Sequence, residues 1–482
     1  MSLQYLADIE STDGPNEGDD ISALHWLEDG VILGGTVKGH LYGWRDTNGQ
    51  YLGEAGKGGH GICINSISSS RQNKVVLTAA LDGTVALWDT SDIAAMLQRS
   101  EVIPTGENEE SSLSQQPDTF PLTLLKSMRL NKKSSAESQS MNEVSVGNEA
   151  QNPRPMDSKR TYCAVLHPTE PIFMTTGSKA ELIIRSYDRD SRQFGQVITS
   201  ISPDGTEKNG KFQESSSGSK VKDFGLCLLV HNSGETVALG TSEGYVHLFQ
   251  IEEKKHLISI KASGQAVKCL HFTPNDELLV GGNDGNVSVF DVQQYVPKSS
   301  SRVTETEDED LFVDGLDEFA DDFTFSQHSI HTMSQTSSNS SLFSQTQPSR
   351  STSLKPVRSW SSHPRGLTGV KASSDGRIVA TSSIDGRVRI WDFKNPATQA
   401  LCNIKQDKDI YAIEWKPVAR DEADDRNATQ ERPSKRCKTV PISNSAMTAA
   451  AQSAKTASMF VTAGADGKVR WYRMAGGNTA NV

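Results

Sequence analysis

Two segments far apart in the chain share one pattern: VVLTAALDGTVALWD at residues 75–89 and IVATSSIDGRVRIWD at residues 378–392. Each places an Asp-Gly pair between two short runs of apolar and β-branched residues. Asp-Gly in that setting is a strong hairpin signal, because glycine adopts the positive φ of a tight turn at little cost. Each segment therefore predicts a β-hairpin, with a tryptophan six residues after the aspartate.

The same spacing recurs along the chain and reveals a repeat. An aromatic residue stands six positions after an Asp-Gly pair, or after a degenerate form of it, at seven places: Trp44, Trp88, Tyr187, Phe249, Phe290, Trp391 and Tyr472. The intervals from Trp44 to Trp88 and from Phe249 to Phe290 agree with the roughly 40–45 residues of one propeller blade. The other intervals are longer and require insertions.

The composition supplies those insertions. Polar stretches that are rich in Ser, Thr, Gln, Asn, Gly or charged residues occupy 101–158, 203–220, 297–356 and 418–457. Such segments bury too little apolar surface to offset the entropy of ordering them, so we expect disordered loops. The predicted blade cores lie near 18–46, 58–92, 159–190, 221–254, 264–294, 357–395, and 409–417 together with 458–474.

The remaining patterns are those of strands. Alternating residues at 62–67, 266–272 and 410–415 predict a strand ahead of a hairpin, and no helical period is sustained. The short apolar stretch at 2–8 can cover the open edge of the last blade, which otherwise lacks a fourth strand. We therefore expect an all-β chain that forms a single seven-bladed β-propeller over residues 1–482, with long disordered loop insertions.

These motifs resemble the WD-repeat family. The signature pairs are Gly59-His60 with Trp88-Asp89, and His363 with Trp391-Asp392, where Ser362 replaces the glycine. The resemblance implies that a His, a Thr, an Asp and the Trp of one blade form a buried hydrogen-bonded tetrad. Two blades have all four members, which are His60, Thr78, Asp82 and Trp88, and His363, Thr381, Asp385 and Trp391.

Other blades keep parts of this set. The last blade has Thr462 and Asp466 with Tyr472 in the aromatic position, and the blade of Phe290 keeps Asp284. A catalytic hydroxyl-His-Asp relay uses the same residue types. Recurrence from blade to blade favours a framework role, in which hydrogen bonds satisfy a buried aspartate. We therefore assign no catalytic residue and expect no enzymatic activity.

Composition and charge exclude several classes of protein. The net charge of −11 argues against a basic nucleic-acid-binding surface, so we expect no direct nucleic-acid binding. No run approaches the roughly 18 apolar residues of a membrane span, and the first residues lack a signal pattern. We expect a cytoplasmic protein, with the nucleus as a second location. The six cysteines form no Cys-x-x-Cys pair, so we expect no metal site. We also expect no cofactor and no small-molecule substrate.

The closing run DGKVRWYRMAGG, residues 466–477, resembles the C-terminus of fungal WD-repeat subunits of the superkiller (Ski) complex. That resemblance implies a non-catalytic scaffold for protein–protein interactions. Its implied partners are the RNA helicase and the tetratricopeptide scaffold of that complex, which supports 3′→5′ cytoplasmic mRNA decay by the exosome. It also implies a role in meiotic recombination. No short motif in the chain identifies the residues that contact these partners.

Two alternatives stay open. One is a nuclear WD-repeat scaffold in a chromatin or ubiquitin-ligase complex, which the basic cluster at 432–438 favours as an import signal. The other is a propeller enzyme with a site in the central channel. That site would need converging carboxylates, histidines or a metal set, whereas the inner strands have apolar residues or Ser and Thr. The acidic stretch at 305–322 is either a docking peptide or a solubilising loop, and its charge favours the loop.

Overall fold

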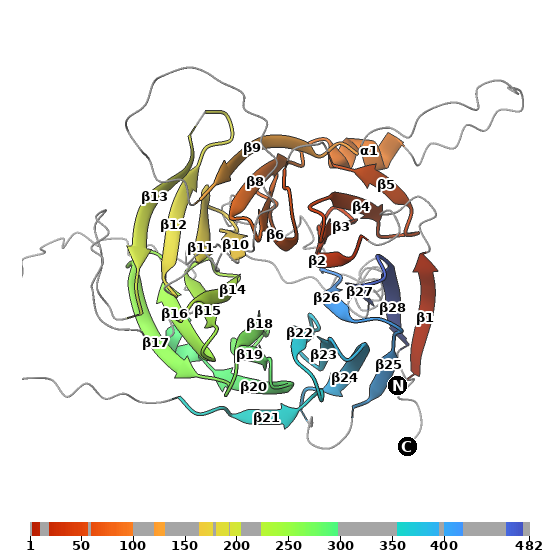
Figure 1. Cartoon of the computed structure of the whole chain (residues 1–482), viewed down its shortest axis with the longest axis vertical. Helices are drawn as coiled ribbons and strands as arrows, with labels where there is room; N and C mark the ends of the chain where they lie inside the picture. The colour runs from red at the N-terminus through yellow and green to blue at the C-terminus, as the bar shows by residue number, and fades with distance from the viewer. Residues whose placement is uncertain are drawn as a thin grey trace, which may run out of the picture. The chain divides into compact units, whose positions relative to one another are not determined.

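The computed structural model describes residues 2–9, 19–55, 59–99, 120–130, 163–176, 180–191, 193–203, 223–296, 354–394, 400–417 and 459–475. These residues form seven four-stranded sheets. Figure 1 shows the sheets as blades around one axis, with one strand of each blade at the centre. The chain is a seven-bladed β-propeller, as the repeat predicted. Residues 299–352 lie outside the described residues.

The first four blades follow the order of the sequence, from the inner to the outer strand. Blade 1 holds β2 (Ile21–Trp26), β3 (Val31–Thr36), β4 (Leu41–Arg45) and β5 (Tyr51–Glu54). Blade 2 holds β6 (Ile64–Ser70), β7 (Val75–Ala80), β8 (Thr84–Asp89) and β9 (Thr123–Arg129). Blade 3 holds β10 (Cys163–Leu166), β11 (Ile172–Thr176), β12 (Leu182–Tyr187) and β13 (Phe194–Ile201). Blade 4 holds β14 (Gly225–Val230), β15 (Thr236–Thr241), β16 (Tyr245–Gln250) and β17 (Lys255–Lys261).

Blades 5 and 7 contain the two longest gaps in the described sequence, 297–353 and 418–458. Blade 5 holds β18 (Val267–Phe272), β19 (Glu277–Gly282), β20 (Asn286–Asp291) and β21 (Arg358–Ser361). Blade 6 holds β22 (Leu367–Ala372), β23 (Ile378–Ser383), β24 (Arg387–Asp392) and β25 (Cys402–Lys405). Blade 7 holds β26 (Ile410–Trp415), β27 (Met459–Gly464), β28 (Val469–Ala475) and β1 (Ser2–Ile9). Helical structure in the described residues consists of α1 (Ile93–Arg99) and the short 3₁₀ helix η1 (Gln293–Tyr295).

Blade 7 combines segments from both ends of the chain. β1 pairs antiparallel with β28, with Leu3 opposite Met474 and Tyr5 opposite Tyr472. Figure 1 shows the two strands side by side at the outside of the blade. The N-terminal strand therefore covers the edge that β28 would otherwise expose.

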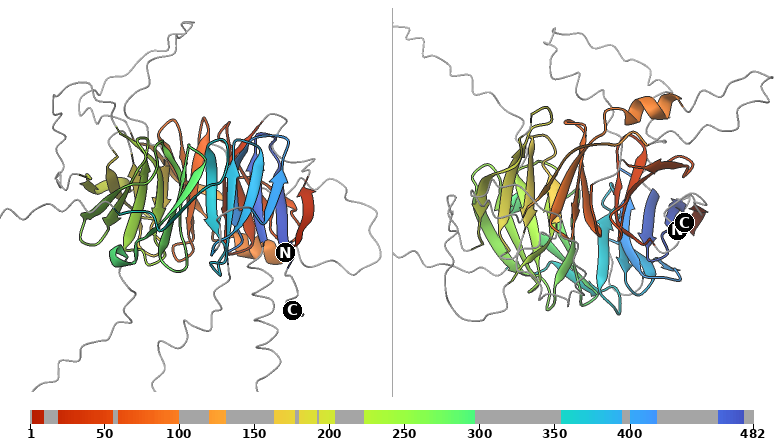
Figure 2. Two further views of the ribbon diagram at one scale, coloured as in Figure 1. Left: turned by 90° about the horizontal axis from the view of Figure 1, so that it is seen from below. Right: turned by 45° about the horizontal axis from the view of Figure 1, so that its top comes forward.

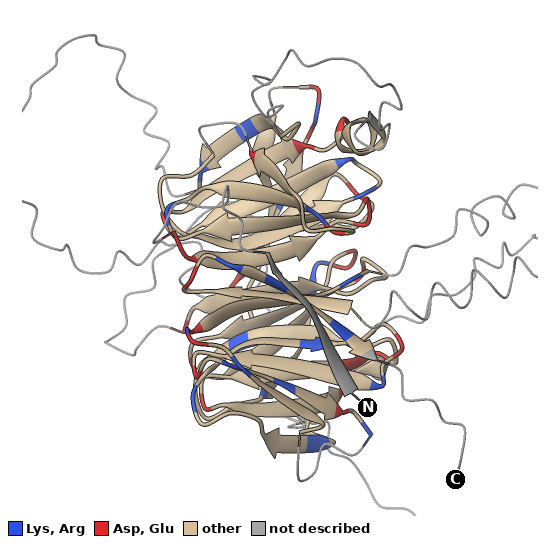
Figure 3. Ribbon diagram, turned by 90° about the vertical axis from the view of Figure 1, so that its right-hand side faces the viewer, with Lys and Arg blue, Asp and Glu red and all other residues tan. Residues whose placement is uncertain are grey.

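The core lies within and between the blades. The second strands β3, β7, β15, β23 and β27 are buried along their whole length, because each blade packs against a neighbour on both faces. This explains the continuous apolar runs of the hairpins, since a strand covered on both faces shows no alternation. In the side view of Figure 2 the blades stand next to one another, and Figure 3 shows charges of both signs distributed over the ribbons.

The structure corrects the predicted insertion at 101–158. Residues 120–130 are ordered within it, and β9 pairs with β8, with Val85 opposite Met128. β9 has a neighbour on one edge only and most of its side chains are half-buried or exposed, so its composition resembles that of a loop. Leu354 in the predicted insertion 297–356 also packs against the core of blade 5. The rest of the four predicted insertions, apart from single residues at their ends, lies outside the described residues.

The blade cores predicted from the sequence are also offset from the observed blades. The predicted cores leave out the outer strands β5, β9, β13, β17 and β25, as the bounds above show. The predicted core 357–395 begins with β21, which pairs with β20 of the preceding blade. The predicted core 357–395 thus supplies the outer strand of blade 5 together with three strands of blade 6.

Candidate functional site

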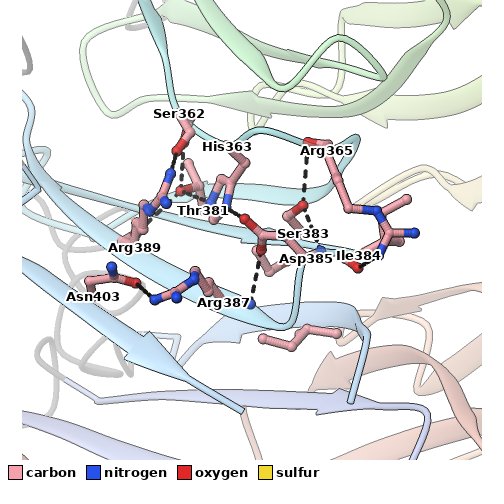
Figure 4. A network of polar contacts seen from close by, with 12 residues as sticks. Ser362, His363, Arg365, Thr381, Ser383, Ile384, Asp385, Arg387, Arg389 and Asn403 are labelled. Carbon is pink, nitrogen blue, oxygen red and sulfur yellow. Dashed lines mark hydrogen bonds and ion pairs between the residues drawn. The ribbon is translucent and has the colours of Figure 1, made fainter. Parts of the chain in front are cut away.

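The tetrad of blade 6 is complete. His363 lies in the loop ahead of β22, Thr381 on β23, Asp385 in the turn that follows β23, and Trp391 on β24. The indole Nε1–H of Trp391 donates to Thr381 Oγ1 at 2.9 Å. His363 Nε2 lies 2.9 Å from the same hydroxyl, and its Nδ1 lies 3.0 Å from Asp385 Oδ2 (Figure 4).

The surroundings of Asp385 fix the turn. Its backbone N–H donates to Ser383 Oγ at 3.1 Å, and its Oδ1 accepts the backbone N–H of Arg387 at 3.0 Å (Figure 4). Burial lowers the pKa of His363 while Asp385 opposes that shift. Asp385 therefore joins the histidine to both strands of the hairpin, through its backbone N–H and its carboxylate. The Ser362 hydroxyl also donates to Thr381 Oγ1 at 2.9 Å.

The hydrogen bonds of the blade 2 tetrad differ from those that were predicted. His60 Nε2 lies 2.6 Å from Thr78 Oγ1, and Trp88 Nε1–H donates to that oxygen at 2.8 Å. His60 Nδ1, however, lies 2.8 Å from Thr84 Oγ1, which donates to Asp82 Oδ1 at 2.5 Å. The hydroxyl of Thr84 thus stands between His60 and Asp82 as a fifth member that the tetrad pattern did not predict.

In blade 7 a glutamine takes the place of the histidine. Gln406 Nε2 donates to Thr462 Oγ1 at 2.8 Å and to the Tyr472 hydroxyl at 3.0 Å. Arg470 donates to Gln406 Oε1 at 3.3 Å and forms an ion pair with Asp466, which completes the set. Gln406 stands four residues before Ile410, as His363 stands four before Leu367, and this spacing is the signal that could have identified it.

Blade 5 keeps a shorter form of the same link. Ser263 Oγ donates to Asp284 Oδ2 at 3.0 Å, and Ser263 also stands four residues before its inner strand. In blades 2, 5, 6 and 7 the residue at this position is therefore linked to the turn aspartate, directly or through one further side chain, whether it is a histidine, a serine or a glutamine.

The buried sets are suited to structure rather than to chemistry. Hydroxyl, imidazole and carboxylate follow one another in blade 6 as they do in a catalytic triad. Thr78 and Thr381, which would be the nucleophiles, have no exposed surface. Each of these hydroxyls also accepts an indole N–H. A substrate therefore cannot reach either oxygen without unfolding the blade.

The Asp-Gly turns pack on the loop that leads into the next blade. A methyl group on Gly285, whose φ is +77°, would lie 2.0 Å from the carbonyl oxygen of His363. The same relation joins Gly39 to His60, Gly244 to Ser263 and Gly386 to Gln406. These turns and loops form one end of the blades, which we call the Asp-Gly face.

Exposed apolar side chains occur on the Asp-Gly face. Val37 in the first turn is 42% exposed and Ile62 in the adjoining loop is 44% exposed. The carbonyl oxygen of Ile62 would lie 3.0 Å from a methyl group on Gly39, so the two segments are in contact. Tyr245, which follows the turn of blade 4, is also exposed. These residues make the face a candidate interaction surface.

The inner strands contain charges that the sequence analysis did not weigh. Lys371 Nζ on β22 lies 2.7 Å from Glu414 Oε2 on β26, and His25 Nε2 on β2 lies 2.7 Å from Ser69 Oγ on β6. Burial lowers the pKa of His25, and it lowers that of His271 to about 3. Glu414 is the one carboxylate on the described inner strands, and its ion pair with Lys371 leaves no acid pair there.

Among the described residues, no group of three or more His, Cys, Asp or Glu side chains is placed to hold a metal ion. Neither helix in this part of the chain is long and apolar enough to cross a membrane.

Comparison with known proteins agrees with this architecture. Residues 55–89, 254–291 and 354–392 match the family model "WD domain, G-beta repeat". Among solved structures, the crystal structure of the Cps50 (Swd1) β-propeller domain from Myceliophteria thermophila is similar to this chain. It has a TM-score of 0.55 and 14% identity, and the match covers 98% of this chain and 100% of that chain. At this identity the likeness shows the fold alone, and no curated protein matched the sequence. The chain is a seven-bladed β-propeller that carries WD repeats.

Proposed function

We propose that the chain is a non-catalytic adaptor that binds protein partners on its Asp-Gly face. The observation that carries this proposal is the exposure of Val37 and Ile62 on two segments that contact each other. Apolar side chains grouped on a surface and surrounded by polar ones mark protein interaction sites. The tetrad hydroxyls of Thr78 and Thr381 are instead buried and accept indole N–H groups.

Within this function we propose membership of the superkiller complex. The partners would be its RNA helicase and its tetratricopeptide scaffold, the location the cytoplasm, and the process 3′→5′ mRNA decay, with a further role in meiotic recombination. Support comes from the closing run at 466–477. In the structure Trp471 and Tyr472 of this run are buried in β28, next to β1. This run therefore belongs to the blade that closes the ring. The resemblance to the superkiller subunits lies in the sequence of that closing blade.

The alternative proposal is a nuclear scaffold in a chromatin or ubiquitin-ligase complex. It rests on the basic cluster at 432–438, which lies outside the described residues. The acidic stretch at 305–322 also lies outside them, so both proposed roles of that stretch stay as predicted.

Affinity purification of the tagged full chain followed by mass spectrometry tests the assignment. We expect recovery of the superkiller helicase together with the tetratricopeptide scaffold. Recovery of chromatin or ubiquitin-ligase subunits without those two proteins would support the nuclear alternative. Recovery of no stable partner would contradict the adaptor function itself.

A further inference from the structure

A patch of apolar side chains lies at the rim between blades 5 and 6. Val357 is 58% exposed and Leu401 is 46% exposed, and each directly precedes the outer strand of its blade, β21 or β25. Their neighbours in the sequence, Trp360, Phe393 and Ala400, pack in one core cluster, so the two segments lie together. Figure 1 shows β21 and β25 as the outer strands of adjacent blades. We call this surface the blade 5–6 patch.

Arg358 joins the two sides of the patch and leaves donors without acceptors. Its Nη1 donates to the carbonyl oxygen of Phe393 at 2.7 Å, and its Nη2 lies 2.6 Å from Glu277 Oε1. Arg358 Nε and Trp360 Nε1 are buried and have no hydrogen-bond partner in the described part of the chain. Both are N–H donors, so an occupant of this patch is favoured if it carries acceptors.

Exposed cations surround the same patch. Lys355 stands two residues before Val357 and Lys394 directly follows Phe393, and neither forms an ion pair with a described residue. The nearby carboxylates are already engaged. Asp392 Oδ1 accepts the backbone N–H of Lys394 at 2.9 Å, and Glu277 pairs with Arg358. The two lysines therefore favour an acidic occupant.

The chain contains a segment of this chemistry. The stretch 305–322 has ten acidic residues and no Lys or Arg, and its apolar residues are Leu311, Phe312, Val313, Leu316, Phe319 and Ala320. It belongs to residues 297–353, which lie outside the described residues. The residues on either side of that insertion, Val296 and Leu354, pack in one core cluster, and Leu354 stands three residues before Val357. The insertion therefore leaves and re-enters the propeller next to the patch.

The tether favours this segment over a second copy of the chain. The nine residue steps from Val296 to Glu305 span at most about 30 Å, which keeps the acidic stretch close to blade 5. A short tether corresponds to an effective concentration in the millimolar range. A second copy that docked patch to patch would instead bring Lys355 and Lys394 towards their equivalents, and like charges across an interface oppose binding.

We propose that the acidic stretch 305–322 docks on the blade 5–6 patch of its own chain. Its apolar side chains cover Val357 and Leu401, and its carboxylates face Lys355 and Lys394. Because Arg358 pairs with Val289 and lies remote from the turn at Gly285, the contact uses the end of the blades opposite the Asp-Gly face. Docking of the stretch therefore leaves the Asp-Gly face open to partners.

Carbodiimide cross-linking of the full chain, mapped by mass spectrometry, tests the proposal because it joins lysines to carboxylates in contact. We expect links from Lys355 and Lys394 to residues 305–322 within one monomer, and their loss in about 1 M salt, where the Debye length is about 3 Å. Leu401→Asp should reduce the yield of these links by about fivefold or more. Val197→Asp should leave the yield unchanged, because Val197 is an equally exposed apolar residue on the outer strand of blade 3.

Lys255 provides a control that needs no variant. It is exposed at the start of β17 in the adjacent blade 4, so links that arise from the tether alone should reach it as often as they reach Lys355 and Lys394. Equal yields at these three lysines would overturn the proposal, as would the absence of links to 305–322 or a yield that a folded Leu401→Asp variant does not change. Links found only between two copies would place the stretch on another molecule and would also overturn it.

Discussion

In blades 2, 5, 6 and 7 the residue four positions before the inner strand is a histidine, a serine or a glutamine, and in each it connects to the aspartate of the Asp-Gly turn. His363 reaches Asp385 directly, His60 reaches Asp82 through Thr84, and Gln406 connects to Asp466 through Arg470. The hydrogen bonds differ, but each set joins a loop, a buried strand and the Asp-Gly turn. These sets hold the three segments in register, since an unpaired polar group in the core is costly.

The two complete tetrads should respond differently to loss of the aspartate. Asp385→Ala removes the direct partner of His363 and leaves a buried imidazole nitrogen unpaired, which costs about 1–3 kcal/mol. Asp82→Ala leaves the Thr84 hydroxyl next to His60, so the loss of stability should be smaller. Urea unfolding of both variants measures this order. Equal losses of stability, or no loss for Asp385→Ala, would contradict these hydrogen-bond assignments.

The buried histidines should make stability depend on pH. Burial lowers the pKa of His60 from 6.5 to about 4. The unfolded chain therefore takes up this proton first as the pH falls, so the stability that neutral His60 contributes is full above about pH 6.5 and is lost between that pH and about pH 4.

We expect the free energy of unfolding to fall by about 1 kcal/mol or more from pH 7 to pH 5. His60→Gln should reduce this difference, because glutamine does not titrate. An unchanged pH dependence in His60→Gln would show that His60 is not the group responsible.

The tetrad residues could be predicted, but their links could not. Thr78, Asp82 and Trp88 keep fixed spacings because they belong to one hairpin. Thr84 was missed because several residues near a turn can supply a hydroxyl, and the sequence does not show which one intervenes. Gln406 was missed because 418–458 separates it from Thr462 and Asp466, and because its residue type differs from the expected histidine.

Among the elements, the Asp-Gly turns form the contacts between one blade and the loop that leads into the next. The glycine of each turn allows the backbone to approach the carbonyl oxygens of the next loop, and it adopts a φ that other residues avoid. The prediction of hairpins from Asp-Gly was right for this reason. The sequence pattern alone did not indicate that the same glycines form contacts between blades.

Gly285→Ala tests the contact between the turn of blade 5 and the loop that leads into blade 6. The new methyl group would lie 2.0 Å from a backbone oxygen at a φ of +77°, so we expect a loss of more than about 2 kcal/mol. Gly264→Ala is the matched control, because no atom lies within 4 Å of its added methyl group. Its effect should stay within about 0.5 kcal/mol. Thermal or chemical unfolding that shows similar stability for both variants would contradict this role.

The outer strands are the elements that the sequence pattern predicted least well. β9 carries Lys126 and Arg129 and buries little, so it has the composition of its polar surroundings. Its place is fixed by backbone pairing with β8, which side-chain patterns do not encode. Inner strands and second strands were predictable because burial on one or both faces leaves a pattern in the sequence.

For the whole molecule, the decisive junction is the one between blades 7 and 1. β1 covers β28 on the outside, and a buried ion pair joins the inner parts. Lys416 Nζ lies 2.8 Å from Asp46 Oδ2, whose side chain is 4% exposed, and Trp26 Nε1–H donates to the same oxygen at 3.2 Å. The ring therefore closes through backbone pairing at its rim and through a charge pair within.

Lys416→Ala should weaken this closure strongly. It leaves the buried carboxylate of Asp46 without its cation, and breaking a buried pair in this way costs about 3 kcal/mol or more. Arg71→Ala breaks the exposed pair with Glu28 between blades 1 and 2, and it should cost less than about 1 kcal/mol. Chemical unfolding of the two variants gives the comparison. A small effect of Lys416→Ala would mean that the pair does not contribute to ring closure.

We propose that this propeller binds its partners through its Asp-Gly face, whereas the tetrads only stabilise the fold. Quantitative co-purification of partners with Ile62→Asp tests it most directly, with Val357→Asp as the control. Val357 is 58% exposed just ahead of β21, at the opposite end of the blades, so both changes add one charge to an exposed apolar site. We expect Ile62→Asp to lose most of the partners at unchanged thermal stability and Val357→Asp to keep them. Full recovery of partners with Ile62→Asp, or their loss with Val357→Asp alone, would contradict it.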